Sequence, residues 1–125
     1  MARSSAEPRP LPATIGELRD AGWRSRTVKE EMRANLVGRL AAGKPVFEGI
    51  VGYEDSVIPA IENAVLAGHD IVFLGERGQG KTRMARLLVN LLDEWLPVVR
   101  GGELNDDPYA PISAASPDCS AKARA

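Results

Sequence analysis

The stretch Gly75-Glu76-Arg77-Gly78-Gln79-Gly80-Lys81-Thr82 matches in full the pattern G-x-x-x-x-G-K-[ST] of a phosphate-binding loop, or P-loop. Four apolar residues, Ile71-Val72-Phe73-Leu74, come directly before it, and such a run is typical of a strand buried on both faces. After the loop, apolar residues recur at helical spacing until Pro97, which predicts one long amphipathic helix. The members of this apolar stripe are Met84, Leu87, Leu88, Leu91, Leu92 and Trp95. A strand before the loop and a helix after it form the context that phosphate binding requires.

Each residue type in the loop has a physical reason. The glycines Gly75, Gly78 and Gly80 let backbone N–H groups approach phosphate oxygens without side chains in the way. The helix that begins near Lys81 offers its free N–H groups and its positive dipole end to the same anion. Lys81 is expected to reach the β- and γ-phosphates, and Thr82 to place its hydroxyl on Mg²⁺. We therefore predict that the whole stretch binds ATP with Mg²⁺, with Thr82 as a metal ligand. The alternative is a glycine-rich strand-to-helix turn that happens to end in Lys-Thr.

Hydrolysis would need a second acidic element, a strand that ends in Asp-Glu and holds Mg²⁺. Asp93-Glu94 imitates it, but these residues lie on the predicted helix that leaves the loop, with no room for a crossover connection. They are interpreted as a solvated helix end, and Asp106-Asp107, which follows no apolar strand, as a turn. Three other residues near the loop are expected to be surface or structural groups: Arg77, Arg83 and His69. No catalytic residue is predicted.

The N-terminal part of the chain predicts two helices. Residues 1–13 are rich in proline without periodicity and are interpreted as a disordered tail. Thr14 with Glu17 fits a capping box that opens a short helix, which Gly22 ends. A second capping box, Thr27 with Glu30, opens a longer helix that ends before Gly43 and Pro45. Its expected buried face consists of Val28, Met32, Leu36 and Leu40.

A third helix is expected between Asp55 or Ser56, either of which can cap it, and Gly68. Pro59 falls in its first turn, where a missing N–H matters little. Its expected buried residues are Val57, Ile58, Ile61 and Val65. Val98-Val99 could begin a second strand, but Gly101-Gly102 interrupts it. The remainder looks like loop, and residues 116–125 are interpreted as a second disordered tail.

Composition excludes several classes of protein. A chain of 125 residues with 44% hydrophobic and 26% charged residues is ordinary for one small globular domain. A net charge of -1 gives no electrostatic footprint for nucleic acid or an anionic membrane. No apolar run reaches the ~18 residues of a membrane helix, and the N-terminus lacks the apolar region of a secretory signal. The single cysteine, Cys119, makes no intramolecular disulfide or metal site. A soluble, cytoplasmic protein is expected.

Residues 50–92, rather less than half of the chain, resemble the start of an AAA+ ATPase module, closest to the MoxR-like ATPases and the I-type subunits of magnesium chelatase. The resemblance rests on Ile50-Val51-Gly52, then a helix, then the apolar strand and the P-loop. It implies that Ile50, Val51 and Gly52 lie near the adenine, and that the full-length protein is a homo-oligomeric ring that couples ATP hydrolysis to remodelling a partner. The family usually has Gln where this chain has Tyr53.

The expected fold class is therefore α/β, an incomplete P-loop NTPase (AAA+) core over residues 46–115, with a helical extension over residues 14–45. No acidic strand, sensor residue or arginine finger is recognisable after the loop, so hydrolysis is not expected from this chain alone, and whether it is an enzyme stays open. A truncated coding sequence and a natural short nucleotide-binding protein both fit. The alternative functions are a non-catalytic interaction module, whose N-terminal helices bind a partner, and a fragment of a small P-loop kinase.

Overall fold

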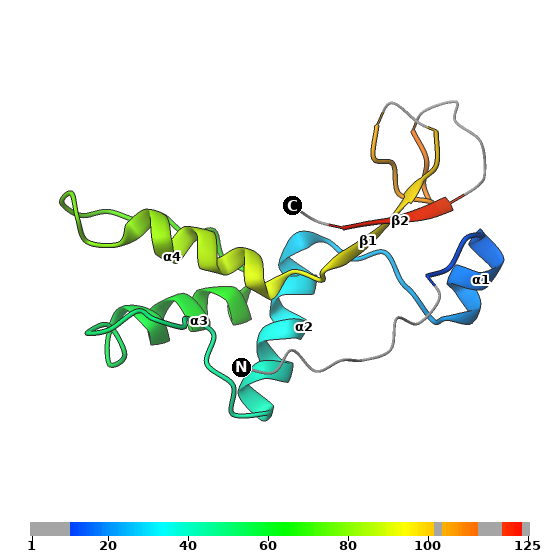
Figure 1. The fold of residues 1–125 in the computed structure, drawn as a ribbon. Helices are drawn as coiled ribbons and strands as arrows, with labels where there is room; N and C mark the ends of the chain where they lie inside the picture. Colours follow the sequence, from blue (N-terminus) through cyan, green and yellow to red (C-terminus); the bar gives the residue numbers. More distant parts are fainter. Residues whose placement is uncertain (1–10, 102–103, 113–118, 124–125) are drawn as a thin grey trace. The chain divides into compact units, whose positions relative to one another are not determined.

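The computed structural model describes residues 11–101, 104–112 and 119–123, so most of the tail predicted over residues 1–13 lies outside the described residues. The secondary structure elements are shown in Figure 1: α1 (Ile15–Asp20), α2 (Val28–Ala41), α3 (Val57–Ala67), α4 (Lys81–Leu87), the 3-10 helix η1 (Leu88–Leu91), β1 (Trp95–Val99) and β2 (Cys119–Ala123). The chain divides into two compact units. One is Arg26–Asp93, and the other combines Met1–Ser25 with Glu94–Ala125.

Helix α2 begins as the sequence predicts. The Glu30 N–H donates to the Thr27 hydroxyl at 3.3 Å, and the Thr27 N–H donates to the Glu30 carboxylate at 2.8 Å, which completes the capping box. The Thr27 hydroxyl also donates to the Glu30 carboxylate, and the bonds from the Thr27 backbone, first, and from this hydroxyl hold the pKa of Glu30 below its ordinary value. Only half of the box predicted at α1 forms: the Glu17 N–H donates to the Thr14 hydroxyl at 3.2 Å, whereas the Glu17 carboxylate accepts the N–H of Ala13 rather than that of Thr14.

Helix α3 ends in the left-handed glycine that the sequence predicts, since Gly68 has a φ of 71° and the His69 N–H returns to the carbonyl of Ala64. Its start differs from the prediction. Ser56 occupies the cap position but makes no side-chain hydrogen bond, and the carbonyl of Tyr53 accepts the Ile58 N–H at 3.0 Å instead. The backbone carbonyl of Tyr53 therefore caps α3 in place of the predicted polar side chain.

The hydrophobic core of the unit Arg26–Asp93 lies among its helices and the short segment before α3. Its buried members are Leu36, Val46, Phe47, Ile61, Val65, Met84 and Leu91. Leu36 and Leu91 are the largest fully buried side chains, which places contact between α2 and η1 at the centre. The predicted apolar faces of α3 and of the helix after the loop both contribute to this core. The predicted face of α2 contributes only in part, because Val28 and Leu40 are largely exposed.

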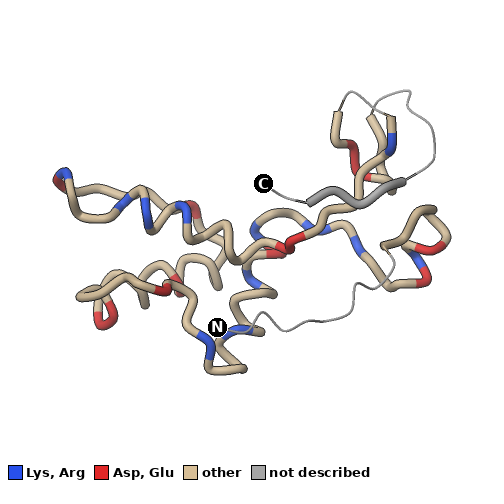
Figure 2. Tube along the Cα trace, in the orientation of Figure 1, with Lys and Arg blue, Asp and Glu red and all other residues tan. Residues whose placement is uncertain are grey.

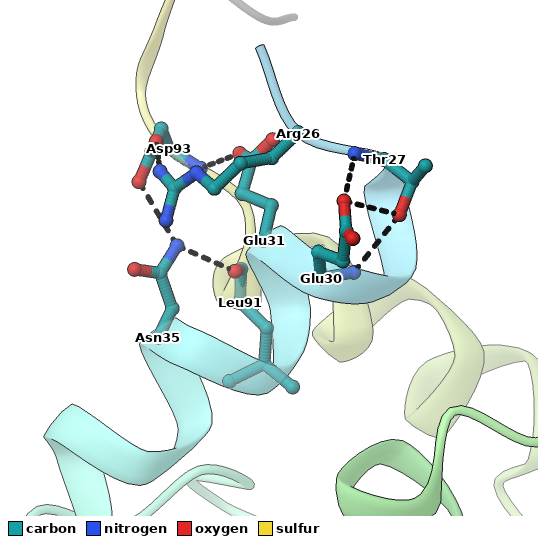
Figure 3. Close-up of polar contacts among 7 residues, drawn as sticks. All are labelled: Arg26, Thr27, Glu30, Glu31, Asn35, Leu91 and Asp93. Atoms are coloured by element: carbon teal, nitrogen blue, oxygen red, sulfur yellow. Dashed lines mark hydrogen bonds and ion pairs between the residues drawn. The ribbon is translucent and has the colours of Figure 1, made fainter. Parts of the chain in front are cut away.

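Polar residues of α2 explain why the helix after the loop is shorter than predicted. Asn35 Nδ2 donates to the Leu91 carbonyl at 2.9 Å, and Arg39 Nη2 donates to the Asn90 carbonyl at 2.8 Å. The buried carboxylate of Glu31 accepts the Asp93 N–H at 2.5 Å (Figure 3). Asn35 and Arg39 thus satisfy free carbonyls at the end of η1, and Glu31 satisfies the N–H of Asp93. The chain leaves helical geometry at Leu92. Trp95, predicted on the buried stripe, instead begins β1 and is 45% exposed.

Residues 71–74 differ from the predicted strand buried on both faces. Ile71 and Phe73 pack against the core, whereas Val72 is 76% and Leu74 is 87% exposed. Alternation of this kind is that of an extended segment with one covered face. Among the described residues, the segment has no ladder partner, and a strand needs a neighbour to accept and donate its backbone hydrogen bonds.

The second unit contains α1 and a two-stranded antiparallel sheet, β1 with β2. The register pairs Trp95 with Ala123 and Val99 with Cys119. The second strand that the sequence allows at Val98-Val99 is β1, which begins earlier, at Trp95, and includes Pro97. Val98 and Val99 are buried. Residues 119–123 of the predicted C-terminal tail form β2, while the rest of that tail lies outside the described residues.

Candidate functional site

The glycines of the P-loop adopt the conformations for which the sequence pattern selects them. Gly78 and Gly80 have φ values of 83° and 72°, in the left-handed region that side chains disfavour. Gly75 has a φ of 150°, and a Cβ there would overlap the side-chain oxygen of Gln79. Every residue from Gly75 to Gly80 is exposed, so the concave backbone is open to a ligand.

Lys81 folds back over the loop. Its Nζ donates to the carbonyl oxygens of Gly75 and Glu76, so the first and last parts of the loop are joined through one ammonium group. The positive charge therefore lies at the mouth of the loop rather than in bulk solvent. Thr82, the next residue, is exposed on the first turn of α4. Helix α4 also carries Arg83 and Arg86 and has no acidic residue, which favours an anion here.

The segment around Ile50-Val51-Gly52 lies beside the loop. Tyr53 Oη donates to the carbonyl of Gln79 at 3.3 Å. The Arg83 guanidinium reaches Gly49, where a Cβ would be only 2.7 Å from Nη2. Ile50 packs against the core, and Val51 is 84% exposed.

Two contributors to this contact were missed by the sequence reasoning. The sequence indicates a surface charge at Arg83 and a departure from a family pattern at Tyr53, and neither interpretation predicts these contacts. The glycine at position 49 was the available signal for Arg83, because a close approach to backbone often requires glycine.

A cavity of about 440 Å³ opens beside the loop, within the unit Arg26–Asp93. Its polar lining residues are Tyr53, Ser56, Gln79 and Lys81, and the rest of the wall is apolar. The apolar wall comes from α3, residues 71–74 and Met84. Small-molecule sites commonly have ~300–1,000 Å³ and a few polar groups on an apolar lining. The volume and the lining both fall within this description.

The acidic residues considered as metal or catalytic groups do not gather at the loop. Asp93 is not a solvated helix end as predicted: its carboxylate accepts Arg26 Nη2 and Asn35 Nδ2, each at 2.9 Å (Figure 3). Glu94 is exposed. The predicted turn at Asp106-Asp107 is confirmed in part, since the Ala110 N–H donates to the Asp107 carbonyl, although Asp106 is buried.

His69 and Asp70 lie at the surface, a position that agrees with the interpretation of His69 as a surface group. Lys29 Nζ is 2.7 Å from Asp70 Oδ1, and this hydrogen bond, followed by the charge of the ammonium group, lowers the pKa of the Asp70 carboxyl. Within residues that the structure describes, no group of three or more His, Cys, Asp or Glu side chains could hold a metal ion. A cation at the P-loop would therefore need ligands from the nucleotide.

Comparison of the chain with models of protein families, with curated proteins and with solved structures finds no match. In the described part of the chain, no helix combines the length and the apolar character needed to cross a membrane. The proposed function is therefore based on the geometry of the P-loop and of the residues around it.

Proposed function

We propose that the stretch Gly75 to Thr82 binds the phosphates of ATP. The observation that carries this proposal is the position of Lys81, whose ammonium group lies against two loop carbonyls at the open mouth of a glycine-rich turn. A phosphate group can replace these two neutral carbonyl acceptors with an anionic acceptor, which adds the attraction between opposite charges to the hydrogen bond of the ammonium group. Gly78 and Gly80, with positive φ, leave the backbone accessible to the same phosphate.

The proposal includes Mg²⁺, which would be held at Thr82. The exposed Thr82 hydroxyl is a hard oxygen ligand of the type that Mg²⁺ prefers, and this ion usually takes only one or two protein ligands beside phosphate and water. The residues present therefore fit a cation that arrives with the nucleotide. Bound there, Mg²⁺ would neutralise charge on the phosphates.

We further propose that the chain is the N-terminal portion of an AAA+ ATPase of the MoxR or magnesium chelatase type, with an incomplete α/β core over residues 46–115. In such a protein, ATP hydrolysis drives remodelling of a partner by a homo-oligomeric ring. The resemblance over residues 50–92 supports this, together with the contact between the Ile50 segment and the loop. The exposed alternate residues Val72 and Leu74 also fit a strand whose sheet is incomplete. A non-catalytic interaction module and a P-loop kinase fragment are the rival functions.

The test compares Lys81→Ala with Arg86→Ala by titration of a fluorescent ATP analogue. Both substitutions remove one cation from α4, but only Lys81 contacts the loop. Loss of a charge-assisted contact worth ~1.5–3 kcal/mol should weaken binding by roughly ten- to a hundredfold in Lys81→Ala, while Arg86→Ala should lose far less. Equal affinities in the two variants would contradict phosphate binding at this loop.

A further inference from the structure

A second cavity, of about 380 Å³, lies in the other unit and has no part in the proposed nucleotide site. Its lining consists of Arg19, Gly22, Trp23, Arg24 and Tyr109. The wall joins the end of α1 to the turn that contains Tyr109, segments far apart in the sequence. Two guanidinium groups and two large aromatic rings thus line one small cavity, and none of its described lining residues is acidic.

The backbone of this cavity is held by several hydrogen bonds. Gly22, with a φ of 74°, ends α1 and lets the Trp23 N–H return to the Leu18 carbonyl at 3.2 Å. Tyr109 Oη donates to the Trp23 carbonyl at 3.2 Å, and Ser25 Oγ donates to the Asp107 carboxylate. These bonds fix the two segments relative to each other, so the aromatic side chains are pre-positioned.

The aromatic rings are tilted against each other, and one arginine lies over the face of one of them. The Trp23 and Tyr109 ring centroids are 5.4 Å apart with an interplanar angle of 60°, and both side chains are half-buried. The Arg19 guanidinium carbon lies 5.9 Å from the centroid of the Tyr109 ring. A planar ligand that entered the cavity would find aromatic and guanidinium surfaces suited to stacking.

Among the described residues, no carboxylate balances the charge of the two cavity arginines, Arg19 and Arg24, through an ion pair. The nearby Asp107 carboxylate accepts hydrogen bonds from Ser25 and from the Tyr109 N–H. Two guanidinium groups that line one cavity repel each other, and an anion between them would remove this repulsion while gaining directed hydrogen bonds.

We infer that this cavity binds a small anion carried on a planar ring. The arginines supply donors for a phosphate or carboxylate, and Trp23 with Tyr109 supplies the surface for the ring. Two sources provide this chemistry, a nucleoside monophosphate and an aromatic carboxylate. The inference does not depend on nucleotide binding at the P-loop, because none of the residues involved belongs to that unit.

Fluorescence of Trp23 provides the test, in the full chain with Trp95→Phe so that one tryptophan remains. Adenosine monophosphate and benzoate are the two ring anions, and adenosine and inorganic phosphate each supply half of the chemistry. At least one ring anion should change the fluorescence at lower concentration than either half. Arg19→Gln and Arg24→Gln should each weaken this binding by roughly tenfold or more.

The control variants test whether binding depends on the cavity arginines rather than on other cations of the chain. Arg100→Gln removes an exposed arginine from the same unit but not from the cavity, and Lys81→Ala removes the P-loop cation; both should bind the ring anion as before. Arg24→Lys keeps the charge without the planar fork and should restore only part of the affinity. The inference is overturned if neither ring anion binds, if phosphate alone binds equally well, or if both cavity arginine variants retain full affinity.

Discussion

Gly80 and Gly38 lie in different backbone conformations, so glycine has a different effect on stability at each position. Gly80 is the cap residue of α4 with a φ of 72°, whereas Gly38 lies within α2 in ordinary helical geometry. A Cβ would meet no atom within 4 Å at either position, so steric overlap plays no part in the comparison. Only the backbone conformation distinguishes them.

We therefore predict opposite effects for Gly80→Ala and Gly38→Ala. An alanine in the left-handed region costs about 1–2 kcal/mol, so Gly80→Ala should shift the loop and weaken binding of the ATP analogue by roughly tenfold. Gly38→Ala should leave binding unchanged and stabilise the protein by about 0.5–1 kcal/mol in denaturant unfolding. A Gly80→Ala variant with the original affinity would show that the loop conformation does not matter for the ligand.

At the scale of secondary structure elements, the sequence predicts the helix boundaries that depend on local contacts better than those that depend on distant residues. The capping box at Thr27 and the left-handed Gly68 are local signals, since all the atoms involved lie within a few residues. The end of η1 is different, because it depends on Glu31, Asn35 and Arg39, which are about fifty to sixty residues earlier in the chain. Hydrophobic periodicity cannot indicate that polar residues of one helix end another.

At the P-loop too, features set by the local motif can be predicted, whereas contacts between distant segments cannot. The motif itself predicts the positive φ values of Gly78 and Gly80, since these follow from glycine at fixed spacing. The contacts from Tyr53 and Arg83 could not be predicted, because they join segments whose approach depends on packing of α3 and α4 in the core. Asp93 was assigned to solvent for a related reason: its partners Arg26 and Asn35 are distant in sequence.

The polar contacts of α2 should make a measurable contribution to stability. Asn35→Ala removes the donor to the Leu91 carbonyl and to the Asp93 carboxylate, and a buried carbonyl without a partner costs about 1–3 kcal/mol. Asn63→Ala, at an exposed position of α3, is the matched control and should change the free energy of unfolding by less than about 0.5 kcal/mol. Urea unfolding followed by circular dichroism measures both, and equal midpoints would mean that this contact contributes nothing.

On the scale of the whole molecule, charge is evenly distributed. Figure 2 shows Lys and Arg residues interspersed with Asp and Glu residues, in keeping with a net charge of -1. Each unit has its own buried residues, with Leu36 and Leu91 in one and Leu18, Val98 and Val99 in the other. The two candidate sites depend on local groups of cations rather than on a general positive field. Ligands at both sites are therefore expected to be small, because a long polyanion would meet acidic residues beyond either group.

The last prediction concerns turnover by the 125-residue chain. The carboxylate considered for holding a catalytic metal, Asp93, is engaged by Arg26 and Asn35, and no described cluster of metal-ligating side chains accompanies Thr82. Hydrolysis also relies on a group that orients water and commonly on an arginine worth ~10³–10⁵ in rate. The purified chain should therefore bind Mg-ATP without releasing phosphate faster than its Lys81→Ala variant. Release well above that blank, and lost in Asp93→Asn, would mean that Asp93 leaves its partners to act at the loop. Release lost instead in Glu76→Gln would assign the reaction to the exposed carboxylate within the loop itself.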